Sequence, residues 1–256
     1  MSPTCSILMS AYNSEKYIAI ATTSVLNQTE KNWELIILDD GSTDFTPEIA
    51  SSFKDKRIIV YRRLLNEGKA KAMHFGLKQC KGRYVLELDA DDWLEPNCLD
   101  TLIKVMNNQP DDVGMIYGHR NVYKDTNDTA IYKRVLQGPE IKDKYHFLGK
   151  MIALGPRFYK TSVLRECGGW QIEPWGDGRL YEDVDVILRI MEKYKVVNIG
   201  YTGYNIRRHH NNITKINRKN WFDTMKKLIK YYVSKWGDEV TVTFDDRHSK
   251  VYFTNQ

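Results

Sequence analysis

Short apolar runs alternate with helical segments between residues 6 and 93, and this alternation limits the possible folds most strongly. Four runs have the length of buried strands: residues 6–9, 33–38, 57–61 and 84–88. Helical segments lie between them. Residues 15–27 show amphipathic periodicity, Thr46 and Pro47 suit the N-cap and first position of a second helix, and a third helix leads to Cys80. Such alternation predicts an α/β fold with a Rossmann-like, mostly parallel central sheet and helices on both faces.

Polar clusters follow three of the expected strands. They comprise Ser10, Tyr12 and Asn13, then residues 39–42 (Asp-Asp-Gly-Ser), then residues 89–92 (Asp-Ala-Asp-Asp). Open sheets of this kind bind ligands at the carboxyl ends of their strands, so we expect the three clusters to form one site.

The third cluster suggests a metal site. Asp89 and Asp91 would point to the same side if the extended backbone continued past the strand. Their charges repel unless a cation lies between them, and Mg²⁺ or Mn²⁺ takes oxygen ligands that it shares with substrate phosphates. A solvated acidic turn is the alternative interpretation.

The chain lacks the glycine-rich phosphate loops of other nucleotide-binding folds. No G-x-G-x-x-G follows the first strand, and no G-x-x-x-x-G-K-[ST] occurs anywhere. We therefore expect a metal ion and side chains to hold any phosphate.

The motifs together resemble the family 2 glycosyltransferases, whose fold is called GT-A. The resemblance covers about residues 4–214 and is carried by residues 6–13 (SILMSAYN), 26–29 (LNQT), 33–44 (WELIILDDGSTD), 66–68 (NEG), 81–84 (KGRY) and 88–93 (LDADDW). It implies an inverting, metal-dependent transfer of a sugar from a nucleoside-diphosphate sugar to an acceptor hydroxyl. We expect the donor to be a UDP-sugar. No Q-x-x-R-W occurs, so a non-processive enzyme is expected.

The resemblance also assigns the donor side of the site. Asp40 should bond the edge of the base, with Ser10 and Tyr12 lining the same pocket and Tyr12 stacking on the base. Asp89 should face the ribose or the diphosphate. Asp91 is the leading ligand for Mn²⁺ or Mg²⁺, while Asp92 is either a second ligand or a helix cap.

Two further donor-side assignments follow from the same resemblance. Family members often carry an arginine near the diphosphate where this chain has Met73-His74, so Lys69 or Lys71 is the expected substitute; a helix-surface lysine is the alternative. His209 matches a recurrent histidine that binds the metal or lies beside the diphosphate. His210 stands where a proline is common, and Arg207 or Arg208 should help neutralise the diphosphate.

Asp183 is the expected catalytic base. The apolar positions Val184, Ile187, Leu188 and Met191 predict a helix that places Glu182 and Asp183 in its first turn. Acids at a helix N-terminus commonly offset the helix dipole, which is the alternative role. By the resemblance, Asp183 takes the proton from the acceptor hydroxyl, Glu182 supports it and Asp185 is a weaker rival.

The C-terminal part is basic. Nine Lys or Arg and a single acid lie between Arg207 and Trp236, in a chain of net charge +5. We expect a GT-A domain at residues 1–214, with a nucleotide-binding half at 1–95 and an acceptor-side half at 96–214. A basic amphipathic helical extension should follow at 215–256. Its helix either packs back on the domain or lies at a membrane surface near a lipid-linked acceptor.

Other segments give weaker signals. The segment from Tyr123 to Lys144 is polar and predicts an exposed hairpin or loop, while residues 241–244 and 250–253 alternate like a hairpin. The four cysteines lack metal-ligand spacing, which favours free thiols. No apolar run approaches a membrane helix and no basic region opens the chain. We therefore expect a cytoplasmic location, with peripheral contact at the inner membrane face as an option.

The predicted partners are a nucleotide-sugar donor and a glycan or lipid-linked acceptor, with no nucleic acid. The predicted context is the synthesis of a cell-surface polysaccharide or glycoconjugate. Two other functions stay open at this point. One is a non-catalytic module that binds nucleotide-sugars or carbohydrates. The other is a sugar-nucleotide pyrophosphorylase, which would be expected to have a glycine-rich loop where this chain has residues 10–13.

Overall fold

The computed structural model describes residues 2–126, 129–172, 178–209, 218–237, 239–245 and 250–255. The helices are α1 (Ile18–Leu26), α2 (Thr46–Ser52), α3 (Lys69–Gln79), α4 (Cys98–Asn107), α5 (Lys144–Lys150), α6 (Thr161–Glu166), α7 (Glu182–Met191) and α9 (Arg218–Trp236). The strands are β1 (Cys5–Ala11), β2 (Trp33–Asp39), β3 (Ile58–Arg62), β4 (Tyr84–Glu87), β5 (Trp93–Leu94), β6 (Val113–Asp125), β7 (Ala130–Leu136), β8 (Arg157–Lys160), β9 (Lys195–Arg208), β10 (Val240–Asp245) and β11 (Lys250–Asn255).

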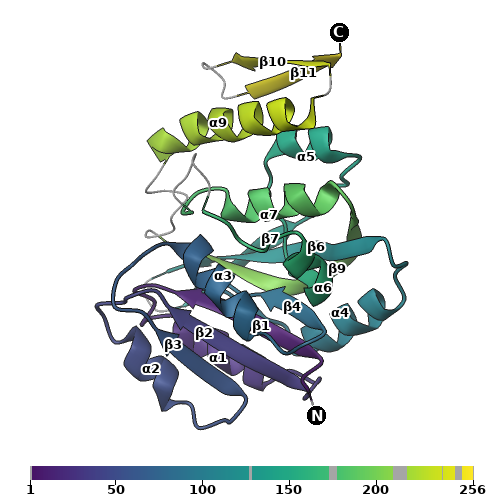
Figure 1. Cartoon of the computed structure of the whole chain (residues 1–256). Coiled ribbons are helices and arrows are strands. Elements are labelled where there is room, and N and C mark those ends of the chain that lie inside the picture. Colours follow the sequence, from purple (N-terminus) through teal and green to yellow (C-terminus); the bar gives the residue numbers. More distant parts are fainter. Residues whose placement is uncertain are drawn as a thin grey trace.

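The central sheet has the strand order β3-β2-β1-β4-β8-β6-β9-β5, and β7 pairs with β6 (Figure 1). The first four strands are mutually parallel, as the alternation predicts. Strand β8 runs antiparallel to both β4 and β6, while β6 and β9 are parallel. The sheet is therefore mixed but mostly parallel, and the carboxyl ends of β1, β2, β4 and β6 lie at one edge.

Helices cover both faces of the sheet and enclose two apolar cores. In β1, Ile7 and Met9 pack with α1 and α4, while Leu8 packs on the opposite face with α3 and α7. This alternation decides where Glu87 of β4 lies. Its neighbour Leu86 belongs to the core with α1 and α4, and Val85 belongs to the core with α3 and α7. Because side chains alternate along a strand, Glu87 is on the same face as Val85 and faces α3 and α7.

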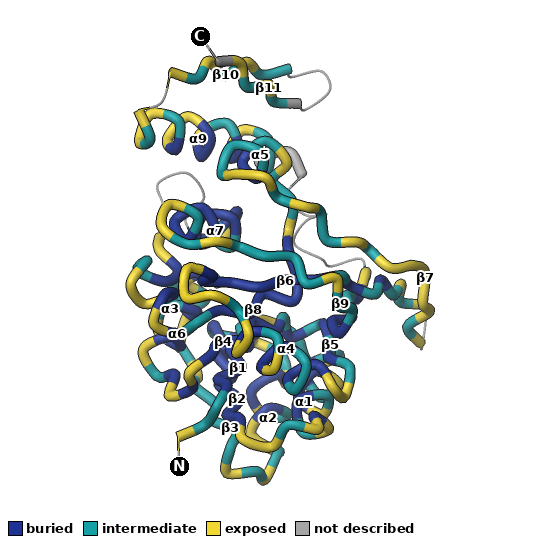
Figure 2. Tube along the Cα trace, turned by 90° about the vertical axis from the view of Figure 1, so that its right-hand side faces the viewer, coloured by how far each residue is buried: buried dark blue, intermediate teal, exposed yellow. Residues whose placement is uncertain are grey.

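Strands β6 and β9 are longer than the apolar pattern indicates. The pattern predicts a strand at residues 113–117, whereas β6 continues to Asp125 and returns through β7. Of the exposed hairpin or loop predicted between Tyr123 and Lys144, the structure has the hairpin, and Figure 2 shows it projecting from the body. Strand β9, with 14 residues, was not predicted, because glycines and polar residues interrupt its apolar positions; pairing along β6 supports it instead.

The C-terminal helix α9 packs back on the domain. Its apolar residues Met225, Leu228, Ile229 and Tyr232 are buried in the core that contains α7. The predicted hairpin forms from β10 and β11 and lies on the far side of α9 from α7 (Figure 1). An apolar contact of this stripe with a lipid surface would require α9 to leave α7. None of the helices within the described ranges is long and apolar enough to cross a bilayer.

Replacing Tyr232 with phenylalanine should loosen this docking. The Tyr232 hydroxyl donates to Asp185 Oδ1 at 2.5 Å, and both side chains are buried. Because a hydrogen bond to a charged group contributes about 1.5–3 kcal/mol, we expect the free energy of unfolding to fall by that amount. Chemical denaturation measures it. Tyr132→Phe, on the exposed strand β7, is the control and should change stability by less than about 0.5 kcal/mol. Equal losses would contradict the account.

Candidate active site

The ends of β1 and β2 are tied together at the carboxyl edge of the sheet. The Asp40 N–H donates to Ala11 O at 2.9 Å, and the Asn13 N–H donates to Ser42 Oγ at 2.9 Å. Ser10 lies in β1 just before this junction, and Tyr12 follows it with 47% of its surface exposed. The predicted base-pocket residues Ser10, Tyr12 and Asp40 therefore lie at one edge. Their contact with a base stays a prediction.

Asp40 also shapes the turn that leads into α3. Asp40 is only 2% exposed, and its carboxylate accepts the Gly68 N–H at 2.7 Å and the Glu67 N–H at 3.2 Å. The Arg63 guanidinium donates to the same group at 3.2 Å. Gly68 has a φ of 98°, which a side chain would strain. A carboxylate can accept about four hydrogen bonds, and donors among the described residues take up three of these positions on Asp40.

Lys69, the first residue of α3, lies among three carboxylates. Its Nζ is 2.6 Å from Asp89 Oδ1, 3.0 Å from Glu87 Oε1 and 3.8 Å from Glu182 Oε1. Burial alone lowers the pKa of Lys69, but Asp89 and Glu87 raise it well above its usual value, so the side chain stays charged. Lys71 instead pairs with Glu67 nearer the surface. Of the two candidate lysines, Lys69 lies beside Asp89.

Glu87 and Arg157 are site residues that sequence reasoning missed. They are direct cross-strand partners on β4 and β8, and both are buried. Arg157 Nε and Nη2 donate to the two oxygens of Glu87, each at 2.8 Å. A glutamate inside an apolar strand was the available signal, since a buried carboxylate needs a charged partner.

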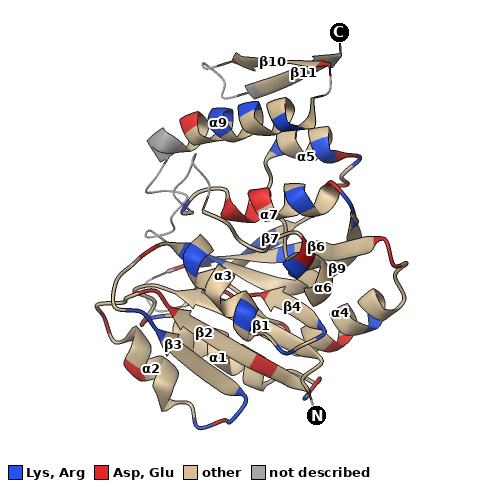
Figure 3. Ribbon diagram, viewed as in Figure 1, with Lys and Arg blue, Asp and Glu red and all other residues tan. Residues whose placement is uncertain are grey.

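The Arg157 guanidinium lies between Asp89, on the predicted donor side, and Asp183, the predicted base. Its Nη1 is 3.2 Å from Asp183 Oδ2 and its Nη2 is 3.4 Å from Asp89 Oδ2. Asp183 lies in the first turn of α7, whose acidic start is visible in Figure 3. The rival Asp185 is buried and bonded to Arg189 and Tyr232, so its carboxylate is already occupied. Asp183 thus meets Asp89 around Arg157, while Glu182 meets Asp89 around Lys69.

Asp91 does not point with Asp89, which corrects the expectation of one extended strand. Strand β4 ends at Glu87, and the Asp92 N–H closes a turn by donating to Asp89 O at 3.1 Å. The turn directs Asp89 toward Lys69 and Asp91 toward His209. Asp91 Oδ2 and His209 Nε2 are 2.8 Å apart.

The Asp91 and His209 side chains are of the types that could hold a divalent cation. Two ligands at right angles on an octahedral ion, with bonds of about 2.1 Å, lie about 3 Å apart. The hydrogen-bonded Asp91 Oδ2 and His209 Nε2 are 2.8 Å apart, so a shift of a few tenths of an ångström would let both reach one ion. The Tyr17 ring packs on the His209 ring at 4.6 Å. Among the residues that the structure describes, no group of three metal-ligating side chains occurs. Donor phosphates would have to supply further ligands, as is usual for Mg²⁺.

Asp92 is placed as a structural residue beside this pair. Its carboxylate is buried and accepts the Arg207 N–H at 2.8 Å, which ties the turn to β9 two residues before His209. Burial and the charge of Asp91 raise the pKa of Asp92 well above its usual value. Arg207 itself is buried and pairs with Asp125 at 2.8 Å. His210 lies outside the described residues.

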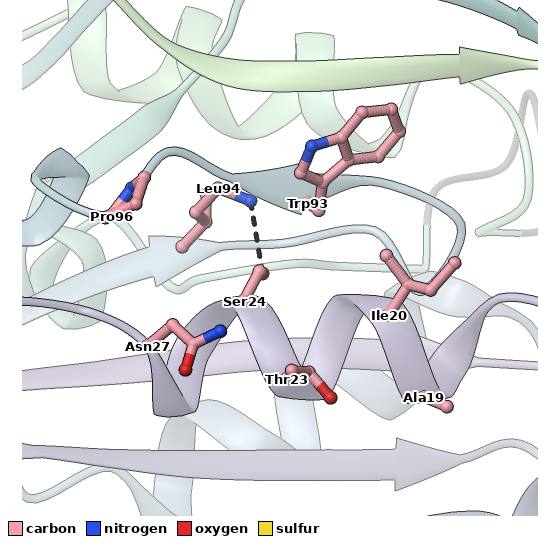
Figure 4. Close-up of a pocket in the computed structure, with 8 residues that line it drawn as sticks. All are labelled: Ala19, Ile20, Thr23, Ser24, Asn27, Trp93, Leu94 and Pro96. Atoms are coloured by element: carbon pink, nitrogen blue, oxygen red, sulfur yellow. Dashed lines mark hydrogen bonds between the residues drawn. The ribbon is translucent and has the colours of Figure 1, made fainter. Parts of the chain in front are cut away.

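A shallow pocket next to this edge does not contain the predicted site residues. It has a volume of ≈ 370 Å³ and is lined by uncharged residues: Ala19, Ile20, Thr23, Ser24, Asn27, Trp93, Leu94 and Pro96 (Figure 4). Ser24 Oγ accepts the Leu94 N–H at 3.1 Å across it. Trp93 lines the pocket, and the Arg207 guanidinium is 4.8 Å from its ring. The charged groups of the candidate site therefore lie outside this pocket.

Glu182 makes stability depend on pH. Burial raises the pKa of Glu182 to about 7, with Asp183 adding to the rise and Lys69 opposing it. The folded state thus keeps a proton that the unfolded state loses, so stability falls as pH rises from about 4.5 to 7. We expect Glu182→Gln to remove this loss and to raise stability at pH 8 by roughly 1–3 kcal/mol. Thermal unfolding at several pH values measures it. A gain that is as large at pH 4 as at pH 8 would contradict this origin.

Comparisons with known proteins agree with the fold. The structure of Staphylococcus aureus TarS 1-349 in complex with UDP-GlcNAc superposes with a TM-score of 0.68 at 18% identity, covering 96% of this chain and 69% of TarS. The mannosyltransferase PcManGT from Pyrobaculum calidifontis, in complex with GDP-Man and Mn²⁺, superposes with a TM-score of 0.62 at 18% identity, covering 93% and 65% of the two chains. At this identity the likeness shows the fold, which is of the GT-A type as predicted.

Curated relatives match parts of the chain at higher identity. An uncharacterised glycosyltransferase of Haemophilus influenzae is 40% identical over 106 residues, which are 41% of this chain and 42% of the relative. The Escherichia coli protein WfaP, a UDP-Glc:alpha-D-GlcNAc-diphosphoundecaprenol beta-1,3-glucosyltransferase, is 37% identical over 127 residues, which are 50% of each chain. The matched segments thus span half or less of these relatives. Residues 6–168, more than half of the chain, match the model of glycosyl transferase family 2, and the chain therefore belongs to that family.

Proposed function

We propose that this chain transfers a sugar from a nucleoside-diphosphate sugar to an acceptor hydroxyl, non-processively, with inversion and with the help of a divalent cation. The observation that carries the proposal is the meeting of Asp89 and Asp183 around Arg157, with Asp91 and His209 beside them. A carboxylate beside the donor side of the site can serve as the base that direct displacement at an anomeric carbon needs.

Each group has a defined task in this proposal. Asp183 takes the proton of the acceptor hydroxyl as the oxygen attacks from the face opposite the leaving diphosphate. Its Oδ2 accepts from Arg157 and its Oδ1 accepts the Val184 N–H, and each oxygen keeps a lone pair for that proton. Asp40, Ser10 and Tyr12 hold the nucleoside, and Lys69 and Asp89 hold the ribose and diphosphate side. Asp91 and His209 would bind Mn²⁺ or Mg²⁺, which supplies positive charge to the departing diphosphate.

The identity of donor and acceptor is supported by the relatives' names. WfaP is named for UDP-Glc and TarS was solved with UDP-GlcNAc, which favours a UDP-linked donor, although PcManGT was solved with GDP-Man and Mn²⁺. The acceptor of WfaP is a lipid-linked diphosphate, so a glycan or lipid-linked acceptor in cell-surface polysaccharide or glycoconjugate synthesis is proposed here.

Two alternatives make different predictions. A sugar-nucleotide pyrophosphorylase is not supported, since the chain belongs to glycosyl transferase family 2. A non-catalytic nucleotide-sugar-binding module would bind the donor and release no sugar from it. Turnover of a bound donor therefore separates the enzyme from the module.

A thermal-shift panel tests the donor side of the proposal. It compares UDP-sugars and GDP-sugars, each with Mn²⁺ and with EDTA. A ligand at 100 times its Kd stabilises the folded state by about 2.7 kcal/mol. We expect this stabilisation to appear as a rise in Tm with a UDP-sugar and Mn²⁺, and as a much smaller rise when EDTA replaces Mn²⁺. A panel without any metal-dependent rise would count against the proposed function.

A further inference from the structure

We propose that Arg157, anchored by the buried Glu87, is a positioning residue that aims the carboxylate of Asp183 at the acceptor hydroxyl. This inference rests on the proposed function, because Asp183 is the base in that reaction. Neither Glu87 nor Arg157 touches the reacting atoms in it. They would act by holding Asp183 and Asp89 at a fixed separation.

The contacts of Arg157 use its whole hydrogen-bonding capacity. A guanidinium has five N–H donors in a rigid plane. Nε and one Nη2 hydrogen go to Glu87, and the remaining Nη2 hydrogen goes to Asp89. The two Nη1 hydrogens go to Leu154 O at 3.1 Å and to Asp183 Oδ2 at 3.2 Å. Because all five N–H groups of Arg157 have an acceptor, the pair with Glu87 fixes the orientation of the guanidinium plane. That orientation in turn fixes the position of the Nη1 hydrogen that Asp183 accepts.

Burial makes this orientation firm. Glu87 is 1% exposed and Arg157 is 6% exposed, and they face each other directly across β4 and β8. A two-bond pair between arginine and a carboxylate fixes direction as well as distance. Lysine has a single charged nitrogen on a flexible stem and cannot make the same fork. Arg157→Lys therefore keeps the charge and loses the geometry.

The two acids around Arg157 depend on it unequally. Asp89 also contacts Lys69 at 2.6 Å, a shorter distance than its 3.4 Å to Arg157. Asp183 is held by Arg157 and by the Val184 N–H of its own helix. Without the guanidinium fork, Asp89 keeps its lysine while Asp183 can turn about its side-chain bonds. A loss in kcat with little change in donor KM should follow.

Arg189 provides a matched control. It is also a buried arginine in an ion pair, with Asp185 at 2.6 Å, and it lies on α7 with Asp183. Its other contacts are the carbonyls of Cys167 and Gly169. Arg189→Lys should lower stability much as Arg157→Lys does, but it leaves the contacts of Asp183 in place.

The experiment measures kcat and donor KM for the wild-type chain, Arg157→Lys and Arg189→Lys, using release of sugar from a UDP-sugar with Mn²⁺. Thermal unfolding sets a temperature at which all three are folded. Since a misplacement of about 1 Å can cost about 10²-fold, we expect a loss in kcat of that order for Arg157→Lys. Donor KM should stay within about three-fold, and Arg189→Lys should keep kcat within about three-fold.

A second measurement asks whether Arg157 acts through Asp183. In an Asp183→Asn background, Arg157→Lys should lower kcat by less than about three-fold more, because residues acting as a unit are not additive. If Arg157→Lys does not fold, Arg157→Gln, which leaves the contact between Glu87 and Lys69 in place, is measured instead with the same expected split.

Three outcomes would overturn the inference. They are equal losses of kcat in the two arginine variants, a rise in donor KM that accounts for the loss, or an undiminished loss in the Asp183→Asn background. A wild-type chain that releases no sugar would overturn the proposed function itself, and with it this inference. An active wild type with any of the first three results would overturn only the role of Arg157.

Discussion

Asp183→Asn should lower kcat for sugar transfer by about 10²–10⁴-fold, the range for loss of a general base. Asparagine keeps the size of the side chain and can accept from Arg157, which is 3.2 Å from Asp183, but it cannot take the acceptor proton. Donor affinity should stay nearly unchanged, since Asp183 makes no described contact with Asp91, His209 or Asp40. Steady-state kinetics and a titration with a UDP-sugar measure the two quantities separately.

Asp185→Asn is the matched control for this result. Asp185 is two residues further along α7, but its carboxylate is buried and bonded to Arg189 and Tyr232. The variant should be less stable and yet keep nearly wild-type kcat where it is folded. If Asp183→Asn kept near-wild-type turnover with unchanged donor binding, the assignment of the base would be wrong.

Asp91→Ala should abolish tight Mn²⁺ binding and with it the metal-dependent part of donor binding. Asp91 Oδ2 is the anionic member of the pair with His209, and the loss of a ligand removes both charge and a coordination position. Titration of Mn²⁺ followed by electron paramagnetic resonance measures this without any turnover. His209→Ala should weaken binding in the same direction, because a neutral imidazole is a metal ligand as well.

Asp92→Asn is the informative control for the metal site. The buried Asp92 carboxylate accepts the Arg207 N–H, and an asparagine oxygen can accept the same bond. We therefore expect Mn²⁺ affinity close to that of the wild type. A loss as large as that of Asp91→Ala would instead make Asp92 a second ligand and would contradict the structural role given to it here.

The parallel half of the fold could be predicted from the sequence because local patterns specify it. Apolar runs and helical periodicity within the first 95 residues predict β1 to β4 and the helices between them, and the polar clusters predict the edge at which they meet. The second half depends on long-range pairing. Strand β9 has few regular apolar positions and is supported by its pairing with β6, which no local pattern reports.

The candidate site shows the same limit. Side-chain alternation would have placed Glu87 with Asp89, but treating residues 84–88 as one apolar run hid the buried charge. Its partner Arg157 is 70 residues away in sequence, and only the antiparallel register of β4 and β8 joins them. The expectation that Asp89 and Asp91 share one side failed because the chain turns after β4. A turn of that kind depends on Arg207 and Tyr204 of β9, whose positions the sequence pattern does not specify.

Inversion with Asp183 as the base can be tested directly by using water in place of the acceptor hydroxyl. The chain is incubated with a UDP-α-linked sugar and Mn²⁺, and proton NMR records the anomer of the sugar first released. An inverting reaction with Asp183 as its base predicts slow release of the β-anomer, stopped by EDTA and lost in Asp183→Asn. Release of the α-anomer first, release that EDTA does not affect, or no release at all would contradict the account.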